Sequence, residues 1–280
     1  MIRESNLPVK NTCTAVGMSR SNYYKYGKQV NVCDTELPLL NEIENITLDF
    51  PGYGYRQVTK QLHRQGKNVN HKKVLRIMRE ANLTHKKKKF KLVTTNSDHD
   101  FPIYKNLVKN ITVTHPNQVW VSDITYIRLI NDYVYLAVIV DLFSRKCIGW
   151  DISRNIDTTL AISVLDMAIN TRQHLGFNDL IHHSDQGMQY ASHEYVNQLE
   201  ELGIRISMSR RGNPYDNAFA ESFIKTLKAE EVYIKEYRTF GEAYRNIKEF
   251  IELVYNKKRL HSSIGYLPPD EFEALKTSLT

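Results

Sequence analysis

The sequence predicts an α/β fold in which a mixed sheet flanked by helices follows a small all-α domain. Apolar residues recur at helical spacing up to residue 81, and from about residue 115 the pattern changes to segments rich in β-branched and aromatic residues. Short apolar segments then alternate with helical patterns, as in mixed sheets covered by helices. The composition of the 280 residues, 41% hydrophobic and 25% charged, excludes wholesale disorder and collagen-like repeats.

Three helical patterns fill the N-terminal part of the chain. The first ends before Pro51 and has an apolar stripe made of Leu39, Ile43, Ile46 and Phe50. Two short helices follow over Arg56–Gln65 and Asn70–Ala81, with a turn at Gly66 between them. Because the second has one apolar and one basic face, the pair indicates a helix-turn-helix-like unit that contacts DNA. A three-helix bundle with solvated lysines is the alternative.

The predicted sheet begins with an antiparallel meander of three strands on short turns: Val119–Leu129, Tyr133–Asp141 and Lys146–Ile152. The remaining elements alternate between helix and strand. They are a helix capped by Asp157 that runs to about Leu175, a strand Leu180–His183, a helix Ser192–Leu202, a strand Ile204–Ser207, a helix capped by Asp216 that runs to about Glu230, and a last helix Phe240–Tyr255.

Basic charge is concentrated in the N-terminal part. Residues 1–110 carry 20 Lys and Arg against 9 Asp and Glu, a net of +11, whereas residues 111–280 carry 18 against 22, a net of −4. This division is typical of a nucleic-acid-binding module joined to a different kind of domain. The run Lys86–Lys89 either neutralises DNA phosphates or is only a flexible linker.

Several features favour a cytoplasmic protein. The longest strongly apolar run, Tyr133–Val140, is too short to span a bilayer, and the first residues contain no signal-peptide pattern. The three cysteines are widely spaced and odd in number, which argues against a disulfide framework. We therefore expect no membrane partner and a reducing compartment.

Three acids stand out by their positions. Asp123 interrupts a buried strand, Asp185 follows a short buried strand, and Glu221 lies on a helix. Carboxylates from separated segments can converge on hard cations such as Mg²⁺. Each acid also has an ordinary explanation, as an edge-strand, turn or solvated helix residue, so their positions alone leave the question open. His182 and His183 point to opposite faces of a strand, so they cannot both chelate one zinc ion.

The residues around these acids resemble one family. The motifs are W-x-x-D-I-T-Y, H-S-D-Q-G-x-Q-Y, G-N-P-Y-D-N-A-x-A-E-S-F and the tail Y-N-x-x-R-x-H-S-S-x-G-Y, in that order, with 35 residues between Asp185 and Glu221. Together they look like the second reading frame (OrfB-type) of transposases of the insertion sequence three family, which have a retroviral-integrase-like DDE core. The likeness covers nearly the whole chain. One departure is Met188, where relatives often carry a small polar residue.

The resemblance implies a ribonuclease-H-like fold and a transposase that cuts and joins DNA. It implies that Asp123, Asp185 and Glu221 are the catalytic residues and the ligands of two Mg²⁺ or Mn²⁺ ions. Element ends and target DNA would be the partners, together with further copies of the chain and the upstream reading-frame product, in the bacterial cytoplasm or nucleoid. A non-catalytic DNA-binding regulator and a metal-dependent nuclease on the same fold are the alternatives.

The remaining site predictions concern DNA contacts and auxiliary roles. The candidate DNA-binding residues are Lys72, Lys73, Arg76, Lys86, Lys87, Lys88, Lys89, Arg210, Arg211, Lys225 and Lys228. The candidate auxiliary residues are His182, Gln186, Gln189, Asn217, Arg259 and His261. The predicted organisation is a helical stub at 1–30, a helix-turn-helix-like domain at 31–92, a linker at 93–114 and an integrase catalytic core with a C-terminal helix at 115–275.

Overall fold

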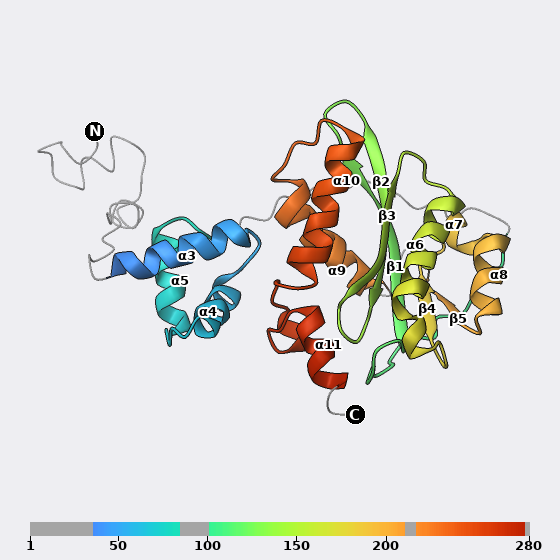
Figure 1. Cartoon of the computed structure of the whole chain (residues 1–280), viewed down its shortest axis with the longest axis horizontal. Helices are drawn as coiled ribbons and strands as arrows, with labels where there is room; N and C mark the ends of the chain where they lie inside the picture. Colours follow the sequence, from blue (N-terminus) through green and yellow to red (C-terminus); the bar gives the residue numbers. More distant parts are fainter. Residues whose placement is uncertain (1–35, 85–100, 211–216, 278–280) are drawn as a thin grey trace, which may run out of the picture. The chain divides into compact units, whose positions relative to one another are not determined.

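The computed structural model describes residues 36–84, 101–210 and 217–277, which fall into two compact units (Figure 1). One unit holds residues 36–49 and 53–84, and the other holds residues 50–52 together with everything from 101 onward. The predicted stub, the lysine run Lys86–Lys89, Arg211 and the cap residue Asp216 lie outside the described residues. Within the described residues, no helix has both the length and the hydrophobicity to cross a membrane.

The N-terminal unit consists of three helices, as predicted. They are α3 (Leu37–Asp49), α4 (Tyr55–Arg64) and α5 (His71–Glu80). Their apolar stripes meet in one small core made of Ile43, Ile46, Val58, Leu62, Val74, Ile77 and Met78. The chain turns after α4 at Gly66, whose φ of +82° suits a residue without Cβ. The Asn70 side chain then caps α5 by accepting a hydrogen bond from the Lys72 N–H at 2.8 Å.

The second unit is built on a five-stranded mixed sheet in the order β3-β2-β1-β4-β5. The strands are β1 (Val119–Arg128), β2 (Tyr133–Asp141), β3 (Cys147–Ser153), β4 (Ile181–Ser184) and β5 (Arg205–Met208). The first three form the predicted antiparallel meander, and β4 and β5 add to β1 in parallel. The structure therefore confirms the ribonuclease-H-like mixed sheet that the resemblance implied.

Helices cover both faces of this sheet (Figure 1). One face packs against α6 (Thr158–Arg172), α7 (Met188–Ala191) and α8 (His193–Glu201), and the other against α9 (Ala218–Leu227) and α10 (Phe240–Glu249). Side chains of β1 alternate between the two cores: Val119, Val121 and Ile127 face α9 and α10, whereas Trp120 and Ile124 face α6 and α8.

Three helix ends differ from the sequence expectation. The helix capped by Asp157 ends at Arg172 and continues to Leu175 as the 3₁₀ turn η2 (Gln173–Leu175). The helix expected to run to Glu230 begins after Asn217 and changes at residue 228 into the π-helical segment η3 (Lys228–Val232). The last long helix likewise becomes π-helical in η4 (Phe250–Tyr255). Apolar periodicity predicts which face is buried, but it does not distinguish these helix types.

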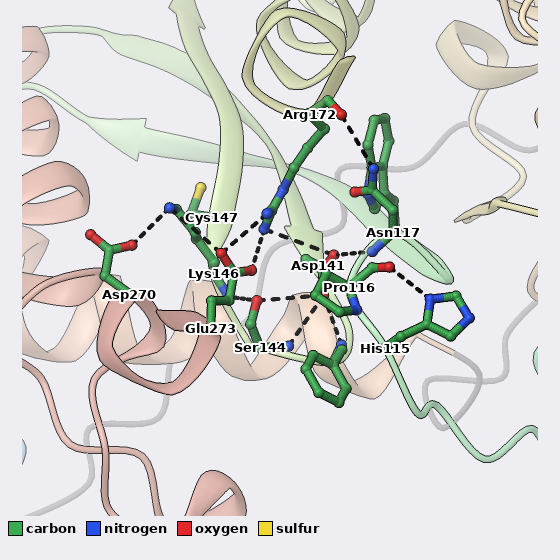
Figure 2. Close-up of polar contacts among 12 residues, drawn as sticks. His115, Pro116, Asn117, Asp141, Ser144, Lys146, Cys147, Arg172, Asp270 and Glu273 are labelled. Atoms are coloured by element: carbon green, nitrogen blue, oxygen red, sulfur yellow. Dashed lines mark hydrogen bonds and ion pairs between the residues drawn. The ribbon is translucent and has the colours of Figure 1, made fainter. Parts of the chain in front are cut away.

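A buried polar network holds the C-terminal helix α11 (Pro269–Thr277) to the sheet (Figure 2). Asp141 is fully buried at the end of β2 and accepts hydrogen bonds from the N–H groups of Asn117 (2.8 Å), Phe143 (2.9 Å) and Ser144 (3.2 Å). Arg172 reaches toward Asp141 from α6 and forms a two-bond ion pair with Glu273 of α11. These contacts join β2, α6 and α11 at the edge where β1 begins.

Candidate active site

The pairing of two parallel strands places the first two acids side by side. In the β1–β4 register, Val121 lies opposite His183, and Asp123 and Asp185 each follow two residues later in the chain, close enough for the charge of Asp185 to act on Asp123. Residues in register on parallel strands share a face, and adjacent strands lie about 4.8 Å apart. Asp185 follows immediately after the last residue of β4. The sheet itself therefore brings together two carboxylates that are far apart in the sequence.

The third acid lies on the helix that crosses this face. Glu221 belongs to the first turn of α9, and contacts at both ends of α9 fix that helix on β1. At its start, the Asn217 amide donates a hydrogen bond to the Ser122 carbonyl at 2.9 Å. After its end, the Lys228 ammonium donates to Thr125 Oγ1 at 2.7 Å. These two contacts, to residues on either side of Asp123, hold α9 across that carboxylate.

The charges of the three acids influence one another. The pKa of Asp123 is raised well above its ordinary value, first by burial and then by the negative charges of Asp185 and Glu221. The Ile124 N–H, 2.9 Å from Asp123 Oδ1, and the Lys228 ammonium act in the opposite direction. Burial lowers the pKa of Lys228 to about 8, against the attraction of Asp123. The surroundings of Asp123 therefore disfavour its ionised form relative to a carboxyl group in water.

The side chains as they lie do not form a finished metal site. Among the residues that the structure describes, no three His, Cys, Asp or Glu groups converge closely enough to hold an ion. Instead, Asp185 Oδ1 accepts a hydrogen bond from the Gly187 N–H at 2.9 Å, and Glu221 pairs with Lys225 at 3.1 Å. Local hydrogen-bond and ion-pair partners thus set the positions of these two carboxylates.

The donor chemistry nevertheless suits a hard divalent cation. All three acids offer carboxylate oxygens, which Mg²⁺ and Mn²⁺ prefer. Beside Asp123, Asn217 Oδ1 is a buried polar acceptor that receives no hydrogen bond from any described residue. The raised pKa of Asp123 shows that negative charge there is left uncompensated. The oxygen donors of these residues therefore suit a divalent ion such as Mg²⁺.

We predict that Asp123→Asn stabilises the protein in the absence of divalent ions. The substitution keeps the shape of the side chain and removes a charge that burial and two neighbouring acids disfavour. The free energy of unfolding should rise by about 0.5–2 kcal/mol, the usual range for a single stabilising change. Both tryptophans, Trp120 and Trp150, are buried in this unit, so their fluorescence reports its thermal unfolding. An unchanged or lower midpoint would contradict the prediction.

Two auxiliary candidates, His182 and Gln189, make contacts within the protein. His182 is buried against Tyr195, whose hydroxyl lies 2.9 Å from Nε2, and burial lowers the His182 pKa to about 3. The ring thus helps to pack β4 against α8. His183 lies on the other face and contacts Ser207 Oγ at 2.8 Å, which confirms that the two rings point apart. Gln189 donates to the Ile156 carbonyl at 3.2 Å. Gln186 follows Asp185 directly and remains a candidate.

Arg259 and His261 pack the C-terminal tail against the rest of its unit. The Arg259 guanidinium is buried and forms two hydrogen bonds with Glu230, at 2.9 and 2.7 Å. The His261 ring packs 4.7 Å from the Tyr255 ring, and burial lowers the His261 pKa to about 3. The sequence alone did not decide whether these two residues touch DNA or dock the final helix, because periodicity does not reveal which polar side chains of a tail are buried.

The candidate DNA-binding residues differ in whether they already have a partner within the protein. Lys72 and Arg210 are exposed. Lys73 and Arg76 both pair with Glu36, and Arg76 also pairs with Glu80. Lys225 of α9 forms an ion pair with Glu221, and the part-buried Lys228, directly after α9, donates a hydrogen bond to Thr125. A DNA phosphate would therefore replace existing partners at most of these cations.

Sequence reasoning missed the role of Thr125, the hydroxyl partner of Lys228 beside Asp123. A signal was present in the alternation of β1, because Val121, Asp123 and Thr125 share the face toward α9. The structure also gathers tyrosines, among them Tyr126, Tyr133 and Tyr233, around one groove beside this strand.

Comparison with known proteins matches the whole described architecture. A family model described as "Integrase core domain" matches residues 113–214, a second model of that description matches residues 202–269, and an "HTH-like domain" model matches residues 34–91. The chain is 40% identical to the transposase for insertion sequence element IS904 of Lactococcus lactis, over 79% of this chain and 87% of that protein. It is 32% identical to transposase InsF for insertion sequence IS3A of Escherichia coli, over 96% and 95%.

Among solved structures, the fold is similar to a chain of the simian T-cell lymphotropic virus intasome. The TM-score is 0.47 and the sequence identity 20%, over 82% of this chain and 74% of that chain.

Proposed function

The chain belongs to the transposases of the insertion sequence three family, and from this premise we propose that it cuts the ends of its element and joins them to target DNA with Asp123, Asp185 and Glu221 as catalytic residues. The observation that supports the proposal is the parallel pairing of β1 with β4, after which Asp123 and Asp185 follow at matching positions beside α9. A regulator without catalysis has no need for three acids whose mutual repulsion destabilises one of them.

In this mechanism Asp123, Asp185 and Glu221 would hold two Mg²⁺ or Mn²⁺ ions, and the chemistry that these ions would supply is activation of water or a DNA 3′-hydroxyl and stabilisation of the leaving oxygen. The chain supplies no covalent nucleophile. The Lys228 ammonium, part-buried next to Asp123, is placed to attract the phosphate that approaches the acids. Asn217 orients the start of α9, and with it Glu221, through its hydrogen bond to Ser122.

The N-terminal unit supplies DNA affinity in this proposal. The helix α5 would approach DNA with Lys72, Lys73 and Arg76, after release of the last two from Glu36. The domains proposed are the stub at 1–30, the DNA-binding domain at 31–92, the linker at 93–114 and the catalytic core at 115–275. Arg210, Arg211, Lys225 and Lys228 would contact DNA around the acids. The protein would act in the bacterial cytoplasm or nucleoid, as several copies on DNA, alone or with the upstream reading-frame product.

Replacement of Lys86, Lys87, Lys88 and Lys89 by Gln should weaken DNA binding across all sequences. Each lysine that binds a phosphate releases a counterion and contributes about −0.9 to the slope of log affinity against log salt. The slope should therefore flatten by about 0.9 for each lysine that binds a phosphate in the wild type. Titrations of a duplex at several salt concentrations measure this, and Gln at the exposed Lys248, Lys257 and Lys258 gives a control with charge removed elsewhere. Equal weakening in the two variants would contradict the assignment.

The experiment that tests the proposed function is a Mg²⁺- or Mn²⁺-dependent assay on DNA that carries the element's ends, with and without the upstream product. A transposase cuts the ends and joins them to target DNA. A nuclease on the same fold yields cut ends but no joined product, and a regulator yields neither. Joined product that depends on the metal supports the proposal, whereas its absence in both preparations overturns it.

A further inference from the structure

A groove lies beside the strand that carries Asp123, and it shares only Lys228 with the chemistry proposed above. Its volume is about 670 Å³, within the range of about 300–1,000 Å³ that is usual for ligand sites. We name it the tyrosine groove, because tyrosines and basic side chains line it, among them Tyr126, Tyr133, Tyr233, Arg128, Lys228 and Lys235. It lies where the β1–β2 hairpin meets the segment between α9 and α10, at the upper end of the sheet in Figure 1.

Hydrogen bonds between its two walls hold the groove open in this shape. The Ile130 N–H of the hairpin donates to the Tyr237 carbonyl at 2.9 Å, and Leu129 forms a parallel bridge with Tyr237. On the side toward the acids, the Lys228 ammonium lies 4.2 Å from the centroid of the Tyr126 ring. The walls are thus fixed by contacts within the protein, and a ligand does not have to pay for ordering them.

The rings of the groove present flat apolar surface to solvent. Tyr133 is 49% exposed and Tyr233 is 42% exposed. Tyr126 and Tyr133 stand edge to face, with centroids 6.0 Å apart and planes at 73°. This arrangement supports the Tyr133 ring from below and leaves part of it uncovered. Exposed aromatic rings in a basic groove are the surfaces on which unpaired nucleobases stack.

The charge of the groove favours a polyanion over a peptide. Among the described residues that line it, three cations face one acid, Glu236. Arg128 is exposed, and neither Arg128 nor Lys228 forms an ion pair with a described residue. Lys235 alone is paired, to Glu231 at 3.1 Å. Arg128 and Lys228 therefore lack a carboxylate partner among the described residues and lie next to exposed aromatic rings, a combination that suits phosphates and bases.

Lys228 connects the groove to the acids. Its side chain lines the groove, and its ammonium bonds Thr125, two residues after Asp123 on the same strand and the same face. A DNA strand with a phosphate at the acids would pass Lys228 and enter the groove with its next nucleotides. Only an unpaired strand can present its bases to the rings, because bases in a duplex are stacked on one another.

We propose that the tyrosine groove binds unpaired nucleotides of the DNA strand next to the cut, with bases stacked on Tyr133 and Tyr233. This inference rests on the proposed function for the direction of the strand, but its binding chemistry is independent of catalysis.

The test uses the full chain and a short single-stranded oligonucleotide that carries 2-aminopurine, whose fluorescence falls when the base stacks. The wild type should quench the probe. Tyr133→Ala and Tyr233→Ala should each lose the quenching and weaken binding of the probe about tenfold, the usual effect of removing one stacking ring. Because the N-terminal unit is basic and adds affinity of its own, quenching is the deciding readout.

Three kinds of control variant separate stacking from other effects. Tyr133→Phe and Tyr233→Phe keep the rings and should quench as the wild type does. Leu253→Ala removes a comparably exposed apolar side chain elsewhere and should change nothing. Glu221→Gln should quench normally, because the groove does not use that carboxylate.

The inference is overturned if the alanine variants quench as the wild type does, or if an acidic peptide displaces the probe from Tyr133 more readily than DNA does. A wild type that cuts and joins DNA yet never quenches would also overturn it, while leaving the proposed function intact. Conversely, quenching without any cleavage would support the groove and contradict the proposed function.

Discussion

Glu221→Gln is expected to abolish strand cleavage and joining while DNA binding persists. Glutamine keeps the size and the hydrogen-bonding ability of the side chain but removes a negative ligand from the proposed metal site. Loss of several kcal/mol of charge stabilisation, at a factor of ten per 1.36 kcal/mol, corresponds to a fall in rate of about 10³-fold or more. Binding should be unchanged or slightly stronger, because one charge that repels phosphate is gone.

Glu249→Gln is the matched control, since it makes the same change at an exposed position of α10. Cleavage and joining by this variant should equal those of the wild type. Gel-based product analysis in Mg²⁺, with DNA affinity measured in parallel, separates loss of chemistry from loss of binding. If the Glu221 variant retains near-normal cleavage, Glu221 is not a ligand in the reaction.

Asp141→Ala should cause the largest loss of stability of any single change considered. The carboxylate is fully buried, and its removal leaves the N–H groups of Asn117, Phe143 and Ser144 without their acceptor. It also removes the charge toward which Arg172 extends. Breaking a buried charged cluster in this way costs about 3–5 kcal/mol in the free energy of unfolding.

Tryptophan fluorescence during thermal or urea unfolding measures this loss in the catalytic unit alone, since both tryptophans lie there. Asp166→Ala is the control: this acid is exposed on α6 and accepts one side-chain bond from Gln198, so its loss should cost no more than about 0.5 kcal/mol. Similar unfolding midpoints for the Asp141 variant and the wild type would show that the polar network contributes little.

The order of helices and strands was predictable because it depends on local patterns. Alternation in β1 and β2, the cap at Asp157 and the apolar stripes of α3 to α5 are all properties of short segments. By contrast, the identification of the ribonuclease-H-like fold and of three acids as catalytic candidates depended on the resemblance to a known transposase family. Asp123 alone, as an acid within a buried strand, had no feature to separate a ligand from an edge-strand residue.

What could not be predicted depends on contacts between distant segments. The partnership of Arg259 with Glu230, the enclosure of His182 by Tyr195 and the bond from Lys228 to Thr125 all join residues that no periodicity links. A polar side chain can be solvated, functional or buried with a partner, and only the packing around it distinguishes these cases. The rotamers of the acids are likewise set by local hydrogen-bond donors, which the sequence does not reveal.

The parallel pairing of β1 with β4 has a consequence for synthesis of the protein. Val119 and Ile181 pair across a crossover of 62 positions, and such non-local contacts form late because the intervening loop must first be closed. The meander of β1 to β3 can fold on the ribosome as soon as it emerges, but it contains only Asp123. Asp185 joins it after the crossover helix has been made, and Glu221 later still. A nascent or truncated chain that ends before residue 221 therefore contains the sheet but lacks the complete set of acids.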